Sequence, residues 1–246
     1  MKKVAEVTLV FWIMKICATT LGETAGDMLS MTFNIGYGLS SIILIGFFIA
    51  TLIAQLSVKK YIPVLYWLVI IATSTAGTTM SDFMDRTLGL GYATGASILA
   101  IMLVSMLFVW YKSEGSLSVT DIKNFRPEMF YWITILISNT LGTALGDYLA
   151  DDSGLGFSGG ALLIGSLILI TVLLHYFTKI SNVILFWIAF VLTRPFGATF
   201  GDLLTKSTDK GGLDLGTIGS SAVLFGILTL LIFYVSVKLH RERIVS

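Results

Sequence analysis

Four aspartates occupy the same position in a pattern that occurs four times along this chain of 246 residues. They are Asp27, Asp82, Asp147 and Asp202. Each lies fifteen residues after a tryptophan, five after a glycine and directly after a glycine or serine, within a long apolar run. An ionised carboxylate in a bilayer costs about 2.5–3.5 kcal/mol even on insertion scales. The repeated aspartate is therefore the first candidate for chemistry.

Polar residues accompany each aspartate on one face of its predicted helix. Three or four residues earlier lie Glu23, Thr24, Thr78, Thr79, Thr143 and Thr199. Seven or eight residues earlier lie Thr19, Thr20, Ser74, Thr75, Asn139, Thr140 and Arg194. Positions separated by three, four, seven or eight residues share a helix face. We therefore expect four polar stripes that face away from lipid and line a common interior.

The charges inside the apolar runs are mostly acidic. Glu23 and the four aspartates stand against two basic residues, Lys15 and Arg194. Such a cluster holds protons or binds a cation. Oxygen ligands suit hard cations such as Mg²⁺, Ca²⁺ or Mn²⁺. We predict the four aspartates and Glu23 as metal ligands, with the threonines as supporting ligands and no resident cofactor.

Other roles remain open for these charged residues. Arg194, which precedes Pro195, most simply supplies a fixed counter-ion to one aspartate, and substrate binding or gating is the alternative. Lys15 could also be a counter-ion, or could extend towards the cytoplasmic face. The aspartates themselves could merely satisfy a turn at the outer interface.

The composition indicates the class of protein that must position these residues. Hydrophobic residues make up 55% of the chain and charged residues 13%, against about 25% charged in a soluble domain. The apolar runs are continuous and long enough to cross a bilayer as helices. We predict an all-α integral membrane protein with eight transmembrane helices, over 5–28, 38–57, 63–86, 92–111, 128–149, 157–178, 182–204 and 216–237. The single cysteine, Cys17, excludes an internal disulfide, and we expect it to be buried.

The spacing of the repeats predicts the organisation of the chain. The aspartates are 55, 65 and 55 residues apart, which indicates two duplicated halves, 1–120 and 121–246, joined by a charged hinge over 112–128. Each half contains two parallel two-helix repeats. Of the Lys and Arg residues outside the runs, eleven fall on the side of the termini and three, Arg86, Lys206 and Lys210, on the other. The positive-inside rule then places both termini in the cytoplasm.

The small residues of the pattern predict how the helices pack. The glycine and the small residue before each aspartate are four apart, as in Gly22 and Gly26 or Gly197 and Gly201. This spacing lets two helix backbones approach closely in a membrane. Four closely packed helices would bring the four aspartates towards one another.

The motifs Gly-Glu-Thr-Ala-Gly-Asp at 22–27 and Leu-Gly-Thr-Ala-Leu-Gly-Asp at 141–147 resemble a known family. It comprises bacterial uncharacterised membrane-anchored proteins built from four glycine–aspartate repeats of unknown function. Ser81 departs from the pattern where the other repeats have glycine. The resemblance implies a four-repeat membrane architecture in the bacterial inner membrane, and no activity. The Gly-Asp dipeptides are also similar to those of bacterial manganese exporters.

The leading hypothesis is a transporter that exports a divalent metal such as Mn²⁺, in exchange for protons. A transporter or channel for a monovalent or organic cation, with the aspartates in proton coupling, is the alternative. A non-transporting structural membrane protein is a third class. No nucleophile–base pair or phosphate loop indicates an enzyme. The expected partners are the lipid bilayer and a small inorganic cation (a divalent metal or H⁺), without nucleic acid, for a monomer or homodimer.

Overall fold

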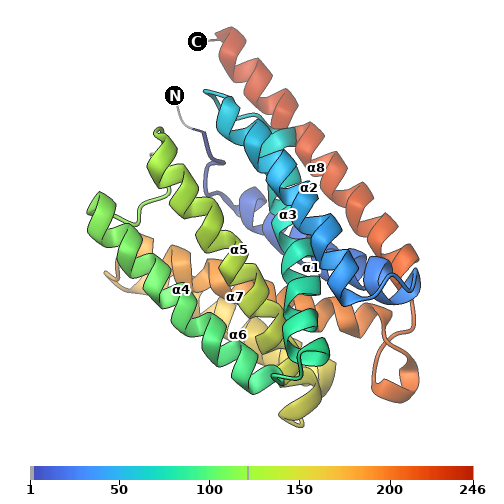
Figure 1. Ribbon diagram of the computed structural model, residues 1–246. Helices are drawn as coiled ribbons and strands as arrows, with labels where there is room; N and C mark the ends of the chain where they lie inside the picture. Colours follow the sequence, from blue (N-terminus) through green and yellow to red (C-terminus); the bar gives the residue numbers. More distant parts are fainter. Residues whose placement is uncertain (1–2, 121, 246) are drawn as a thin grey trace.

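The computed structural model describes residues 3–120 and 122–245, with side chains described as far as Glu242. Within these residues the chain folds into eight α-helices and no strand (Figure 1). The helices are α1 (Leu9–Asp27), α2 (Tyr37–Ser57), α3 (Pro63–Asp82), α4 (Tyr92–Glu114), α5 (Phe125–Asp147), α6 (Gly156–Phe177), α7 (Asn182–Thr205) and α8 (Thr217–Val245). The all-α prediction is confirmed. The predicted ranges agree to within three residues, except that α1 begins four residues later than expected, α3 ends four residues earlier and α8 ends eight residues later.

Seven of these eight helices are long and apolar enough to cross a membrane. The eighth, α1, carries Lys15, Glu23 and Asp27 within its 19 residues. Consecutive helices run in opposite directions. Because their number in the described chain is even, both of its ends lie on one side of the molecule (Figure 1).

The odd-numbered helices α1, α3, α5 and α7 form an inner ring. Each packs against the next, and α7 packs against α1, so the ring is closed. The even-numbered helices lie outside it. Each outer helix packs mainly on the inner helix of the following unit: α2 on α3, α4 on α5, α6 on α7, and α8 back on α1. The outer helix of each unit therefore covers the inner helix of the next unit rather than that of its own.

The outer helices expose apolar side chains to their surroundings. Ile42 on α2, Ile101 on α4, Leu162 on α6 and Leu230 on α8 are each about 70% exposed, at 69%, 69%, 72% and 70%. Most polar and charged side chains of the inner helices are buried. This distribution reverses that of a soluble domain, in which the surface carries the charged residues.

The aspartate ends of the first three inner helices share an unusual backbone. A five-residue π-helical turn follows Asp27, Asp82 and Asp147 directly, over Met28–Thr32, Phe83–Thr87 and Tyr148–Asp152. Turns of this kind are rare and occur often at functional sites. The fourth helix, α7, instead continues to Thr205. Four glycines at positive φ, Gly36, Gly91, Gly156 and Gly216, lie where the outer helices begin. An L-residue would be strained there.

Glycines on the inner helices permit the close packing that the sequence predicts. A Cβ added to Gly22 would lie 2.3 Å from the hydroxyl of Ser74, and one added to Gly197 would lie 2.6 Å from the hydroxyl of Thr19. The same position in the second repeat, Gly77, meets the backbone of α5 at 3.0 Å. A larger residue at these contacts would force the neighbouring helices apart.

This packing predicts the effect of adding one methyl group. We expect Gly197→Ala to lower the free energy of unfolding by about 1–3 kcal/mol, because α1 and α7 must separate to admit the Cβ. Thermal unfolding of the purified protein in detergent, followed by circular dichroism, measures the change. Gly226→Ala is the matched control, since a Cβ there meets nothing within 4 Å. Equal stability of the two variants would contradict the packing argument.

Candidate functional site

The four aspartates converge at one end of the inner ring. Each is buried, with 2–3% of its surface exposed. They are bridged in pairs by two basic side chains, Arg86 and Lys206, which we call the mouth cations. Arg86 contacts Asp82 at 2.9 Å and Asp147 at 3.2 Å, and Lys206 contacts Asp27 at 2.7 Å and Asp202 at 3.0 Å. One bridge therefore joins α3 to α5, and the other joins α7 to α1.

One turn deeper, the guanidinium of Arg194 occupies the inside of the ring. It is fully buried and donates from Nη1 and Nη2 to Oε2 of Glu23, both at 3.0 Å. It also donates to the hydroxyls of Thr78 and Thr143. These three partners stand four residues before their aspartates on α1, α3 and α5, and the fourth equivalent residue is Ala198 on α7 itself. The expectation that Arg194 pairs with an aspartate is wrong, because Glu23 is its carboxylate partner.

Lys15 lies deeper still, near the middle of α1. Its ammonium donates to Oδ1 of Asn139 at 3.3 Å and lies 4.1 Å from the centre of the Phe190 ring. Nδ2 of Asn139 in turn donates to the hydroxyl of Thr73 at 3.0 Å. Lys15 is fully buried, so it neither extends to the end of the helix nor pairs with an aspartate.

An aromatic layer closes the other end of the ring. The residue before each repeated tryptophan is buried there: Phe11, Tyr66, Tyr131 and Phe186. The hydroxyls of Tyr66 and Tyr131 form a hydrogen bond with each other, and the rings of Phe11 and Phe186 lie 6.4 Å apart. The polar interior is thus separated from this end by packed rings. At the aspartate end, the polar interior reaches the surface at the mouth cations, whose side chains are partly exposed.

Three of the five predicted metal ligands lie close enough to share one ion. Glu23, Asp147 and Asp202, which we call the carboxylate triad, can each place an oxygen within 4.8 Å of the other two. Mg²⁺ and Ca²⁺ bind oxygens at about 2.0–2.6 Å, so small side-chain movements would let these oxygens surround a hard cation. Asp27 and Asp82 do not belong to this group, although each contacts the same mouth cation as one of its members.

The predicted threonines divide according to their place on the helix. Thr78 and Thr143, four residues before an aspartate, face the interior and contact Arg194. The threonines three residues before an aspartate face away from the interior. Thr24 accepts a hydrogen bond from Ser221 on α8 at 2.8 Å, while Thr79 and Thr199 donate to carbonyls of their own helices. A one-residue step rotates a side chain by about 100° around the helix, which separates the two groups.

The mouth cations are not among the site residues predicted from the sequence. Arg86 and Lys206 were counted as charges of the outer side, yet each follows an aspartate by four residues. Two basic residues at this position, in the second and fourth repeats, are the signal that could have identified them. Lys206 lies just beyond α7, where burial lowers its pKa, but the Asp202 and Asp27 carboxylates outweigh burial and raise the pKa above its usual value. Its ammonium therefore stays charged.

A second buried charge pair lies at the opposite end. Glu128, expected in the charged hinge, is a buried residue of α5. It pairs with Lys3 and accepts a hydrogen bond from Gln55 at 3.2 Å. This pair attaches the N-terminal segment to α2 and α5. Cys17 is buried as expected, and its thiol donates to the carbonyl of Leu224.

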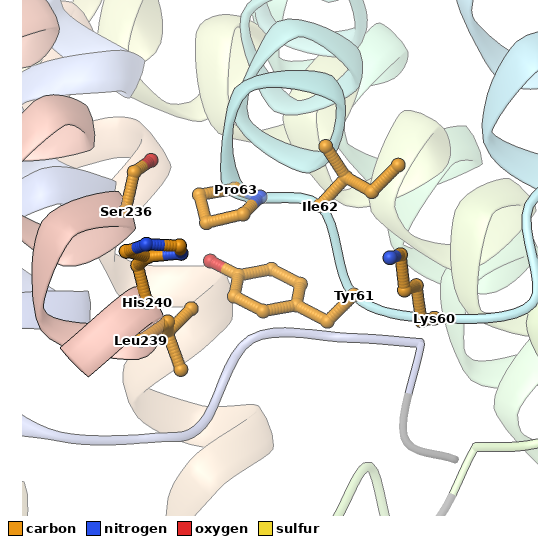
Figure 2. Close-up of a pocket in the computed structure, with 7 residues that line it drawn as sticks. All are labelled: Lys60, Tyr61, Ile62, Pro63, Ser236, Leu239 and His240. Carbon is orange, nitrogen blue, oxygen red and sulfur yellow. The ribbon is translucent and has the colours of Figure 1, made fainter. Parts of the chain in front are cut away.

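A groove of about 300 Å³ at this end lies between the α2–α3 connection and the last turns of α8 (Figure 2). It is lined by Lys60, Tyr61, Ile62, Pro63, Ser236, Leu239 and His240. The Tyr61 hydroxyl points towards His240 (Figure 2), and burial raises the pKa of Tyr61 to about 12. None of the predicted site residues lines the groove, so the carboxylate cluster remains the candidate site.

A family model matches four successive segments of the chain, 10–61, 65–116, 130–181 and 185–238. The chain belongs to the family Repeat of Unknown Function (DUF347). Each matched segment covers one inner helix and the outer helix that follows it, so the family repeat is the two-helix unit. The predicted resemblance to a four-repeat family is thereby confirmed, and the likeness to manganese exporters stays a prediction. No curated protein and no solved structure matches the chain.

The Arg194–Glu23 pair predicts a large effect on stability. Removing one partner of a buried pair leaves the other charge uncompensated, which typically costs about 3–5 kcal/mol. We expect Arg194→Met to destabilise the DUF347 protein by this amount, and Glu23→Gln added to it to restore part of the loss. Thermal and denaturant unfolding of the single and double variants measure the coupling. Arg126→Met, at an exposed arginine on α5, is the control. If the stability changes of the two single variants simply add in the double variant, the Arg194–Glu23 pairing is refuted.

Proposed function

We propose that this protein is a multi-pass protein of the bacterial inner membrane, with all eight helices in the bilayer and both termini in the cytoplasm. Seven apolar helices and the exposed apolar surface of the outer helices support this arrangement. The polar helix α1 fits it too, because α3, α7 and α8 surround α1. Its charged side chains are buried against partners rather than exposed to lipid.

We further propose that the protein transports a small cation, foremost a divalent metal such as Mn²⁺, outward across the membrane. The observation that carries the proposal is the carboxylate triad: oxygens of Glu23, Asp147 and Asp202, from three different helices, lie within 4.8 Å of one another in a buried interior. Carboxylates are the ligands that hard divalent cations prefer. A buried charge cluster within a membrane helix bundle commonly marks an ion pathway.

The charge balance of the interior supports exchange rather than permanent binding. Five carboxylates face Lys15, Arg194 and the two mouth cations, which leaves a net charge of −1 when all are ionised. A divalent ion would bring this to +1 if every cation remained in place. If one mouth cation withdraws as the divalent ion binds, the net charge becomes zero with every carboxylate ionised, which favours exchange of one cation for the other.

The described arrangement corresponds to a site that faces one side only. The mouth cations at the aspartate end have side chains that are 29% and 19% exposed. Towards the other end, Arg194 and then the aromatic layer of Phe11, Tyr66, Tyr131 and Phe186 fill the ring. Transport would require Arg194 and this layer to rearrange, as alternating access does in other carriers. Arg194 would then serve as a gate.

Two other functions make different predictions. A carrier for a monovalent or organic cation would use the same aspartates for protons and would respond weakly to Mn²⁺. A purely structural role is favoured by the observation that each of the four repeated aspartates already contacts a mouth cation. In that case, removal of an aspartate would lower stability and change no flux.

Flux through proteoliposomes tests the proposal. We expect the reconstituted wild-type protein to move Mn²⁺, and the double variant Asp147→Asn, Asp202→Asn to lose at least about 90% of that flux, because it removes two ligands of the triad. Asparagine keeps the side-chain size, and a thermal-unfolding measurement identifies variants that fail to fold. Asp209→Asn, at an exposed aspartate of the same end, is the control.

The outcomes separate the three functions. Normal Mn²⁺ flux in the double variant would rule out the triad as the site. Flux of Na⁺ or an organic cation without Mn²⁺ flux would support the alternative carrier. Unfolding of the double variant, combined with a wild-type protein that moves no cation, would support the structural function.

A further inference from the structure

The two mouth cations are held in different ways. Arg86 lies on the π-helical turn after α3, and its guanidinium contacts two tyrosine rings, at 5.8 Å from the centre of Tyr37 and 5.5 Å from the centre of Tyr92. Its Nη1 also donates to the Tyr37 hydroxyl at 3.4 Å. These contacts and the ion pairs with Asp82 and Asp147 restrain Arg86 from four helices, α2, α3, α4 and α5. Cation–π contacts of this kind add to the ion pairs.

Lys206 has a fixed backbone and a less restrained side chain. Its N–H donates to the carbonyl of Asp202 at 2.8 Å, and its carbonyl accepts from the N–H of Asp214 at 3.0 Å. Within the described part of the chain, the contacts found for its ammonium are the carboxylates of Asp27 and Asp202. No aromatic ring of the described residues lies over it. A flexible four-carbon stem on a fixed backbone can move its charge without moving the helix.

Both mouth cations touch a member of the carboxylate triad, so a metal ion in the triad would lie close to each. Arg86 contacts Asp147, and Lys206 contacts Asp202. Like charges at such distances repel strongly where little water is present. Arg194 also contacts the triad, at Glu23, but its side chain is fully buried, whereas the mouth cations are partly exposed. The charge that can withdraw towards solvent is therefore a mouth cation, and the less restrained of the two is Lys206.

We propose that Lys206 is a tethered counter-ion that neutralises Asp27 and Asp202 until a divalent cation replaces it, whereas Arg86 stays in place. This inference rests on the proposed function and narrows its substrate class. With Lys206 withdrawn towards solvent and Arg86 retained, the interior carries a net charge of −2, which a divalent cation neutralises and a monovalent cation does not. Withdrawal also frees Asp27 beside the triad as a further ligand.

The test is Mn²⁺ binding to the purified full-length protein in lipid nanodiscs, measured by calorimetry. We expect Lys206→Gln to bind Mn²⁺ about tenfold more tightly than wild type, equivalent to about 1.4 kcal/mol. We expect Lys206→Arg to remain close to wild type, because the positive charge is kept. Lys210→Gln removes one exposed positive charge a few residues away and should leave the affinity unchanged. Arg86→Gln should lower thermal stability without the same gain in affinity.

A second measurement follows the movement itself. Labelling by a membrane-impermeant amine reagent, quantified by mass spectrometry, should modify Lys206 several-fold faster when Mn²⁺ is present than when K⁺ replaces it. Lys210 serves as the internal reference, and its labelling should not change.

The failures of the two ideas are distinguishable. If wild type binds Mn²⁺ but Lys206→Gln binds no more tightly, or Arg86→Gln tightens binding equally, the tethered counter-ion is refuted while the cation site stands. If neither wild type nor any variant binds Mn²⁺, the proposed function itself fails, and this inference fails with it.

Discussion

Close contact between helix backbones is the constraint on which the rest of this structure depends. Glycines at matching places on α1, α3, α5 and α7 let each inner helix lie directly against the next, and without them the ring would be too wide for its polar side chains to meet. Gly142 shows the connection most clearly, because a Cβ there would lie 2.2 Å from Cγ of Arg194. The space that glycine leaves is the space through which the arginine stem passes to reach Glu23.

The ring is built from four repeats, but its charges differ from one repeat to the next. Four equivalent aspartates are divided into two pairs by Arg86 and Lys206, and the layer below contains one carboxylate, Glu23, and one guanidinium, Arg194. Arg86, Lys206 and Arg194 each contact a carboxylate, whereas Lys15 contacts the amide of Asn139. The interior is therefore nearly neutral although it contains nine charged side chains, and this balance allows such a cluster to exist inside an apolar bundle.

The outer helices stabilise this arrangement from a distance. Because each one packs on the inner helix of the next unit, and α8 returns to α1, no unit can leave the ring without exposing the face of its neighbour. The Lys3–Glu128 pair adds a further link between the N-terminal segment and α5. A carrier built in this way would change shape mainly by side-chain and helix-end movements at Arg194, Lys206 and the π-helical turns, since the ring itself is closed.

The sequence alone determined much of the local structure. The apolar runs located all eight helices, because helix length and position follow from continuous hydrophobicity. The register of the repeat predicted that the four aspartates lie at equivalent positions of four helices. Glu23, Thr78 and Thr143, four positions before the first three aspartates, are among the predicted site residues, and in the structure all three contact Arg194.

Only the tertiary structure decided which charges pair. Arg194 meets Glu23 rather than an aspartate, Lys15 meets Asn139, and Glu128 is buried against Lys3 instead of lying in a hinge. Thr24, Thr79 and Thr199 face away from the interior, although their sequence positions are one step from residues that face it. These outcomes depend on the order of helices around the ring and on how far each helix is rotated about its own axis. A repeat pattern records neither, because both are fixed by packing between segments that lie far apart in the chain.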